Sequence, residues 1–454
     1  MNKLLSFKKH VFAKTCAVLC ALTMPVMMSC QDDDTPTGPV NTKTSFTIAV
    51  IPDAQNMTDF KHQKAKGFAL DCSELFIQQM QYIADHSEAK GGDIVFAISV
   101  GDMWQHQTLD MDPEHAARGF KAIFNPYFST EIEVSPEAVF NVELPTARKG
   151  LDLLHKVSIP FGAVPGNHDY DAMWSDSKWI PVSDPSQILG SLPEYIGMLH
   201  IGGLSNFNAV LGCHTKYFAQ KDWYLDSYNG GANSVQMICA GGYTFIHLGL
   251  EMSPSNEVLT WAQAVLDKYK GYPTILTTHD YLDTKGQRKA NPIVDLKLAD
   301  SDHHNNAEEL WSKFISKNAQ IFMVLCGHEH GQNRRTDKND KGGEVYQLLA
   351  DYQERGEVGV EHGQPLNPYF NTPYGIGDGW LRRLEFEMGG DVPTVHVRTY
   401  STYYKKFSTE IPDYAARYKS IEHKGENISD AEFIAMDDFV IELKDFRTRF
   451  GFPK

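Results

Sequence analysis

The chain has 454 residues, of which 42% are hydrophobic and 11% aromatic, enough apolar side chain for one large core or two ordinary ones. The formal net charge is −16, and the sequence contains no basic tract of the kind that follows a phosphate backbone. Nucleic acid is therefore not expected as a main partner.

The first 29 residues are typical of an export signal. A lysine-containing start precedes the largely apolar stretch VFAKTCAVLCALTMPVMM, which leads into MMSC, ending at Cys30. A cysteine in this place resembles the lipobox of bacterial lipoproteins. It predicts a lipid anchor on Cys30 and a location in the cell envelope, at the outer membrane or cell surface. The alternative is an ordinary signal peptide of a secreted protein with an incidental cysteine.

Residues 30–45 are polar and contain Pro and Gly, which predicts a flexible tether between this anchor and the fold. Four further cysteines are too few for a disulfide framework in so long a chain, although one bridge remains possible. They are Cys72, Cys213, Cys239 and Cys326.

Short apolar runs alternate with helical patterns from residue 46 onward. The runs are often β-branched and are typical of strands buried on both faces. They lie at 46–51, 94–100, 159–164, 243–250, 273–278 and 321–326. Apolar residues at helical spacing predict helices around 75–83, 258–269 and 310–315, the last one capped by Asn305 or Asn306. The alternation predicts an α/β domain over residues 46–402 with a mainly parallel sheet.

The later part of the chain has a different pattern. Three runs, at 344–350, 380–387 and 394–401, predict strands of a further, more antiparallel sheet. The stretches 103–150 and 170–242 are long and irregular, and we interpret them as insertions that wall or cover a site. Residues 403–454 are expected to form a C-terminal extension of helix and loop, with one more strand, that packs on the domain.

Polar side chains directly follow five of the predicted buried strands. In chain order they are Asp53 and Gln55, Asp102, Asn167 to Asp169, His279, and His328 and His330. The carboxyl ends of strands in open α/β sheets are where ligands bind. Carboxylates, amide oxygens and imidazoles without thiolate suit divalent ions such as Zn, Mn, Fe or Mg. Seven such ligands are too many for one ion with an open position, so they predict two ions that share a carboxylate, about 3.5–4 Å apart.

In this order, D-x-Q, G-D, G-N-H-D, an isolated His and G-H-x-H resemble the motifs of the calcineurin-like metallophosphoesterases, over about residues 46–390. The resemblance implies a four-layer α/β/β/α sandwich of two mixed sheets flanked by helices. It also implies a hydrolase that cleaves phosphomonoesters or phosphodiesters of small molecules by attack of a metal-bridging hydroxide. Carried over by position, the first ion is held by Asp53, Gln55, Asp102 and His330. The second is held by Asp102, Asn167, His279 and His328, with Asp102 as the bridge.

The same resemblance implies roles for the residues beside these ligands. His168 would stabilise the phosphoryl oxygens or protonate the leaving alkoxide. Asp169 would either orient His168 or cap the loop. For substrate binding we consider Asn167, Trp104 and His214. Trp104 would stack on a base, sugar or lipid group, or pack beneath the insertion, and His214 would reach the site from the long insertion, or lie on the surface.

The sequence departs from the family pattern at two places. Gln55 stands where many members have histidine, which predicts a weaker first site. Gln105 stands where some members carry an acid, so that position supplies no carboxylate to His168. Three alternatives stay open. Two are narrower enzymes, a nucleotidase and a phospholipid phosphodiesterase, and the third is a non-catalytic surface-binding lipoprotein on the same fold. The presence of Asp102, Asn167 and His168 argues against the last of these.

Overall fold

The computed structural model describes residues 43–124, 133–176, 199–288, 294, 296–299, 304–368 and 370–453. The predicted export signal, Cys30 and nearly all of the predicted tether lie outside the described residues. No helix in the described ranges has the length and apolar composition needed to cross a membrane.

The first of two large sheets joins strands from both ends of the domain. Its order is β16–β15–β14–β1–β2–β4, with β17 also paired to β15. The strands β1, β2 and β4 run parallel, and the remaining pairs are antiparallel. The strands are β1 (Ser45–Ile51), β2 (Ile94–Ser99), β4 (Phe161–Ala163), β14 (Trp380–Glu387), β15 (Thr394–Ser401), β16 (Lys406–Phe407) and β17 (Asp438–Glu442).

The second sheet has the order β12–β13–β11–β10–β9–β8–β7. Its four central strands β13, β11, β10 and β9 are parallel, and β12, β8 and β7 are antiparallel to their neighbours. The strands are β7 (Tyr224–Tyr228), β8 (Asn233–Ala240), β9 (Tyr243–Gly249), β10 (Thr274–Asp280), β11 (Ile321–Gly327), β12 (Gly331–Lys338) and β13 (Glu344–Asp351).

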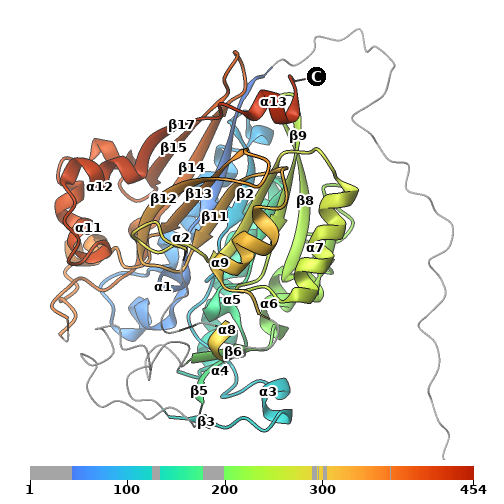
Figure 1. Cartoon of the computed structure of the whole chain (residues 1–454). Helices are drawn as coiled ribbons and strands as arrows, with labels where there is room; N and C mark the ends of the chain where they lie inside the picture. The colour runs from blue at the N-terminus through green and yellow to red at the C-terminus, as the bar shows by residue number, and fades with distance from the viewer. Residues whose placement is uncertain are drawn as a thin grey trace, which may run out of the picture. The chain divides into compact units, whose positions relative to one another are not determined.

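The two sheets pack face to face, and helices cover their outer faces. Between the sheets, the Phe46 ring of β1 lies 5.6 Å from that of Phe245 in β9 and stacks on Phe386 at 4.7 Å. The helices α2 (Ser73–Asp85) and α5 (Leu144–Lys156) bury their apolar faces against the first sheet. The helices α7 (Asn256–Lys268) and α9 (Ala307–Leu310) do so against the second (Figure 1). The fold is therefore the four-layer α/β/β/α sandwich of two mixed sheets that the sequence predicted.

Shorter elements complete the domain. A small third sheet pairs β5 with β3 and β6. The remaining elements are β3 (Ala122–Ile123), β5 (Ala172–Asp176), β6 (Leu199–Gly202), α1 (Gln55–Thr58), α3 (Pro113–Ala117), α4 (Pro136–Ala138), α6 (Ser205–Leu211), α8 (Leu296–Ala299), α10 (Glu357–Glu361), α11 (Tyr414–Glu422), α12 (Asp430–Asp437) and α13 (Phe446–Phe450). Asn306, one of the two expected caps, accepts the backbone N–H of Glu309 at the start of α9.

The three later strands do not form a sheet of their own, so that prediction is wrong. The strand β13 pairs in parallel with β11, whereas β14 and β15 extend the first sheet beside β1. The pattern of a strand is local, but its partner is set by residues far along the chain, so the sequence pattern indicated strands without their neighbours.

Part of the expected insertion at 170–242 belongs to the second sheet, because β7 and β8 lie within it. The polar residues of β8 obscured its strand pattern in the sequence. Ser234 and Gln236 are buried there because Gln236 donates to Ser234 and accepts from the His247 ring. The stretch 103–150 likewise contains most of the long helix α5. Among the described cysteines, all four that follow Cys30 are free.

Candidate metal centre

Five loops bring polar side chains to one place, where the parallel strands of both sheets end. Each residue of the site lies in, or within a few residues after, one of five strands: β1, β2, β4, β10 or β11. The residues brought together are Asp53, Gln55, Asp102, Asn167, His279 and His328. Nearly all of these side chains are buried, so their polar atoms depend on one another or on a ligand for partners.

Close backbone packing is needed to bring these loops together. A Cβ on Gly166 would lie 2.1 Å from Oδ1 of Asp102, and one on Gly327 would lie 2.3 Å from Oδ1 of Asp53. Asp102 and His328 themselves have φ values of +52° and +74°, which are unfavourable for residues with a side chain. Such strain concentrates at functional sites because the surrounding structure holds it in place.

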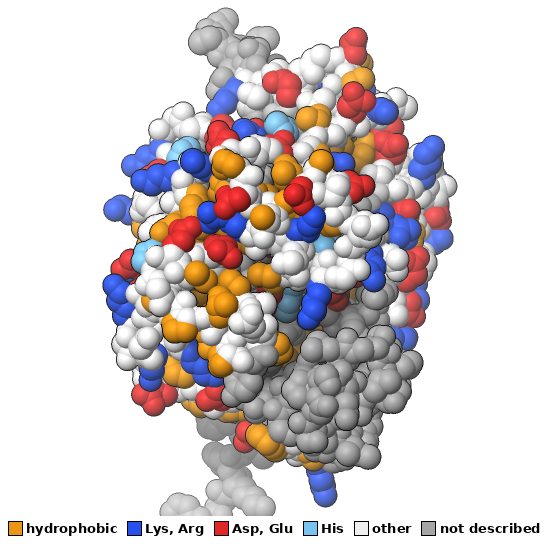
Figure 2. All heavy atoms as spheres, turned by 90° about the vertical axis from the view of Figure 1, so that its left-hand side faces the viewer, with side chains coloured by type: hydrophobic (Ala, Val, Ile, Leu, Met, Phe, Trp, Pro, Cys, Tyr) orange, Lys and Arg blue, Asp and Glu red, His pale blue; other side chains and the backbone are white. Residues whose placement is uncertain are grey.

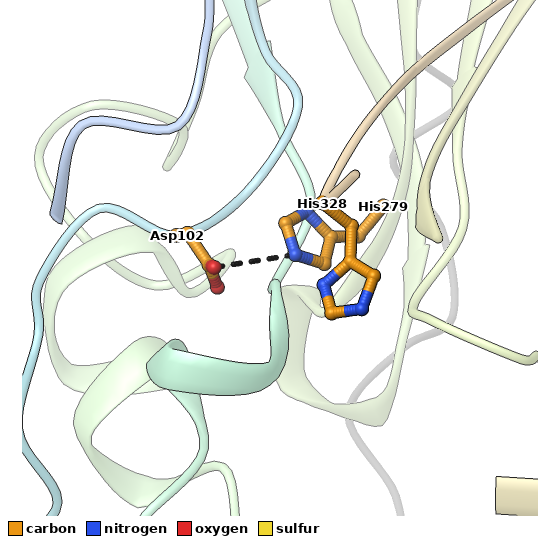
Figure 3. A group of neighbouring side chains, drawn as sticks. All are labelled: Asp102, His279 and His328. Carbon is orange, nitrogen blue, oxygen red and sulfur yellow. Dashed lines mark ion pairs between the residues drawn. The ribbon is translucent and has the colours of Figure 1, made fainter. Parts of the chain in front are cut away.

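Asp102 and His279 form the centre of the cluster (Figure 3). Oδ2 of Asp102 lies 3.3 Å from Nε2 of His279, and Oδ1 of Asn167 lies 3.2 Å from the same nitrogen. Nδ1 of His279 donates to the carbonyl of Val100 at 2.8 Å, which aims Nε2 at these two oxygens. Burial opposes the charged ring, yet the Asp102 carboxylate raises the pKa of His279 to about 9. The position beside Nε2 therefore favours a positive charge.

His328 stands beside this pair, with its ring centroid 5.0 Å from that of His279. The ligand atoms of Asp102, His279 and His328 all lie within 4.8 Å of one another. Nε2 of His328 is buried and has no hydrogen-bond partner. The backbone N–H of His328 donates to Oδ2 of Asp53 at 2.8 Å, which ties the loop after β11 to the loop after β1.

Asp53 and Gln55 complete the group: Oδ1 of Asp53 lies 3.7 Å from Nδ1 of His279, and Gln55 contacts Asp102. Gln55 donates from Nε2 to Oδ2 of Asp102 at 3.1 Å, and its Oε1 is buried without a partner. Oδ1 of Asp53 is likewise buried without a partner. Burial and the neighbouring carboxylates of Asp351 and Asp102 raise the pKa of Asp53 well above its usual range.

The donor set fits a pair of divalent cations. Three buried acceptors lack a hydrogen-bond partner: Asp53 Oδ1, Gln55 Oε1 and His328 Nε2. Buried polar atoms in native proteins almost always have partners, so three orphans in one cluster indicate a missing ligand. Oxygen and imidazole donors around shared carboxylates are the ligands that such ions prefer.

His330 lies at the edge of this arrangement. Its side chain is 52% exposed, and Nδ1 is 3.4 Å from Oε1 of Glu354. Its Nε2 accepts from Nε2 of Gln353 at 2.7 Å, and Gln353 in turn accepts from Gln55. The expected seventh ligand is therefore connected to the cluster through another side chain.

His168 lies beside Asp102, and its contacts with the loops use only one of its two ring nitrogens. Its backbone N–H donates to Oδ1 of Asp102 at 2.9 Å, and Nδ1 donates to the carbonyl of Gln105 at 2.7 Å. Nε2 then carries no proton in the neutral ring. Asp169 accepts the N–H groups of Met103 at 2.8 Å and Gly166 at 2.9 Å. Of the two roles considered for Asp169, these contacts favour holding the loops over orienting His168.

Two residues considered for substrate binding lie elsewhere. Trp104 is fully buried, 6.4 Å from Phe207 of α6 between ring centroids, and packs in the core outside the first sheet. It exposes no ring face on which a substrate could stack, so the structure contradicts that role. His214 is exposed in the turn after α6, and no contact among the described residues joins it to the cluster.

Asp351 and Gln353, at and just after the end of β13, were missed from the sequence. Oδ1 of Asp351 accepts the N–H of Gln353 at 2.9 Å, and its Oδ2 is buried without a partner. Burial raises the pKa of Asp351 to about 6. An acid directly after the apolar run VYQLLA was the available signal, the same one that marked Asp53. We did not use it because β13 was assigned to a different sheet.

Comparison with known proteins gives limited matches. No family model matches the chain. Uncharacterized protein YvnB of Bacillus subtilis (strain 168) is 28% identical over 265 residues, which cover 57% of this chain but only 16% of that protein.

A dimetal phosphatase from Danio rerio aligns with a TM-score of 0.36 and 12% identity, over 79% of this chain and 96% of its own. The structure of TT1561 of Thermus thermophilus aligns with a TM-score of 0.30 and 11% identity, over 75% and 93%. At such TM-scores neither likeness carries weight, and the functional conclusion depends on the geometry of the site.

Proposed function

We propose that this protein is a metal-dependent phosphoesterase that holds two divalent ions at the ends of its parallel strands. One observation carries the proposal: five loops converge so that Asp102 faces His279, Asn167 and Gln55 while three buried acceptors around it have no partner. Buried polar residues that only stabilise a fold usually satisfy each other.

The ligand set divides into two groups that share Asp102. Asn167, His279 and His328 would hold one ion, and Asp53, Gln55 and His330 the other. Bound ions lower the pKa of water and offset the charge that develops on phosphoryl oxygens. Asn167 would also contact the substrate, since it directly precedes His168 in the same loop.

His168 supports the step in which the ester oxygen leaves. Its Nδ1 proton is fixed on the Gln105 carbonyl, so Nε2 is the atom that can approach a phosphate. A protonated Nε2 can donate to a phosphoryl oxygen or give its proton to the leaving alkoxide. Such proton transfer contributes about 10²–10⁴-fold to a rate.

The test is hydrolysis of p-nitrophenyl phosphate and bis-p-nitrophenyl phosphate. Protein stripped with a chelator should be inactive, and Mn²⁺, Zn²⁺, Fe²⁺ or Mg²⁺ added singly should restore turnover. The relative rates on the two compounds then distinguish a monoesterase from a diesterase. A folded protein that binds metal and cleaves neither compound would favour the alternative of a non-catalytic binding protein.

The natural substrate is a small-molecule phosphoester in this proposal. Nucleotides and phospholipid headgroups are the two narrower candidates, which nucleoside monophosphates and phosphatidylcholine vesicles would separate. We also propose that Cys30 carries a lipid that anchors the chain in the cell envelope. Replacement of Cys30 by alanine should release the protein from the membrane fraction and abolish labelling by a fatty-acid analogue.

A further inference from the structure

The segment 351–355, which follows β13, touches the proposed cation ligands from a side that the sequence motifs did not indicate. The Gln353 side chain lies between Gln55 and His330: its Oε1 accepts from Nε2 of Gln55, and its Nε2 donates to Nε2 of His330. The backbone carbonyl of Gln353 also accepts from Nδ2 of Asn56 at 3.3 Å. The segment is thus attached to α1, the short helix that begins at Gln55.

These two ligands need support that the others already have. His279 is oriented by the Val100 carbonyl, but Gln55 is a flexible amide, and the His330 side chain is half exposed. Fixing a long or exposed side chain costs conformational entropy unless a neighbour orders it beforehand. Gln353 accepts from Nε2 of Gln55, which leaves Oε1 of Gln55 free for the ion. It also holds the His330 ring beside Gln55 until the cation replaces the Gln353 N–H at Nε2 of that ring.

The segment itself is fixed by Arg355, whose side chain is fully buried. Its guanidinium forms an ion pair with Glu422, donates to the Tyr414 hydroxyl at 2.7 Å and donates to Asp437 at 3.1 Å. Aromatic rings surround it, with Tyr352 at 3.9 Å and Tyr418 at 4.7 Å from the guanidinium carbon. Glu422, Tyr414 and Asp437 belong to α11 and α12, so the C-terminal helices hold this segment.

The C-terminal helices lie at the edge of the first sheet, beside β15 and β17 (Figure 1). Acidic and basic side chains are interspersed over this side of the molecule (Figure 2).

We propose that Gln353 is a positioning residue for the first cation, holding Gln55 and His330 together, and that Arg355 and the C-terminal helices keep it in place. The inference rests on the proposed function, since it assigns Gln55 and His330 to one ion. It gives residues 403–454 a part in metal binding beyond covering the sheet edge.

The test measures binding of Mn²⁺ alone, by calorimetry and by metal content after dialysis. Gln353→Met keeps the length of the side chain but removes both hydrogen bonds. It should lower the affinity for one of the two ions by about 10–100-fold, as expected for a residue that orients ligands. The affinity for the other ion should stay unchanged. Excess Mn²⁺ should then restore turnover. The matched control is Gln364→Met, because Gln364 follows α10 and its side chain, among the described residues, accepts the Ala69 N–H and bonds to none of the proposed ligands.

A second pair of variants tests the C-terminal anchor without disrupting the fold. Tyr414→Phe removes the hydroxyl that accepts from Arg355 and donates to Asp437. It should weaken the binding of the same ion by about 3- to 10-fold, within the range of net hydrogen-bond contributions. Tyr346→Phe is the control, since its hydroxyl bonds at the far end of β13 to Glu344 and Glu442.

The outcomes are distinguishable. Unchanged affinity for both ions in Gln353→Met, or equal loss of both, would overturn the inference while leaving the proposed function standing. A wild-type protein that binds no Mn²⁺ would refute the proposed function, and the inference with it. Selective loss of one ion in Gln353→Met but not in Gln364→Met supports the assignment.

Discussion

Two clusters of buried ionisable groups, one around Arg355 and one around Asp102, differ in how many of their polar atoms have hydrogen-bond partners. Around Arg355, the side chains of Glu422, Asp437 and Tyr414 supply a partner to every guanidinium nitrogen. Around Asp102, buried acceptors on three other side chains have no partner. Both regions bury charge, but the Arg355 guanidinium has a partner at every nitrogen, whereas the three acceptors beside Asp102 have none.

The difference separates a structural cluster from a functional one. Arg355 and Arg382 hold the pKa of Asp437 below its usual range despite its burial, so opposite charges compensate each other there. In the candidate metal centre, burial and neighbouring carboxylates raise the pKa of Asp53, so the groups around Asp53 do not compensate its charge. An excess of buried acceptors is stable only with a proton or a cation among them.

The largest effect is expected from Asp102→Asn, which removes the carboxylate shared by both groups of ligands. Metal content should fall for both ions, and turnover on p-nitrophenyl phosphate should drop by more than about 10³-fold, since even one stabilising donor is worth about 10²–10³-fold. Emission spectrometry of dialysed protein measures the metal. Retention of both ions by the variant would contradict a bridging role.

His168→Ala should separate chemistry from metal binding. We expect turnover to fall by about 10²–10⁴-fold, the range for loss of a proton donor, with two ions still bound. The control is metal content of the same preparation. If ions and activity were lost together, His168 would belong with the ligands instead.

Arg355→Met tests the cluster of Arg355 with its acidic partners. It leaves Glu422 and Asp437 buried without their cation, and should lower the free energy of unfolding by about 3–5 kcal/mol in urea. Arg417→Met is the matched control. Arg417 pairs with Glu361 and Asp413 at the surface, where an ion pair is worth less than about 1 kcal/mol. Equal losses in the two variants would remove the distinction between these arginines.

The positions of the clustered polar residues could be predicted from sequence because each one follows a local signal. An apolar run indicates a buried strand, and a polar residue directly after it lies at the carboxyl edge, where parallel strands gather their ends. Asp53, Asp102 and Asn167 all satisfy this rule. The alternation of apolar runs and helical patterns predicted the α/β domain, whereas the arrangement in two packed sheets was implied by the family resemblance.

What the sequence did not predict depends on distant partners. Arg355 is buried because of Glu422 and Asp437, which lie 67 and 82 residues further along the chain. The sheet that β13 joins is decided by β11, and with it the place of Asp351 and Gln353 in the site. No local pattern in the sequence contains this information.

The smallest predicted effect, on stability, connects the two clusters. Mn²⁺ at about 100 times its dissociation constant should raise the free energy of unfolding of the wild-type protein by about 2.7 kcal/mol for each ion bound, because it binds the folded state alone. Urea titrations with and without Mn²⁺ measure this. Arg355→Met should lower both curves while still gaining from Mn²⁺, whereas Asp102→Asn should gain little. A wild-type protein equally stable with and without Mn²⁺ would mean that protons, not cations, are the partners of the buried acceptors around Asp102.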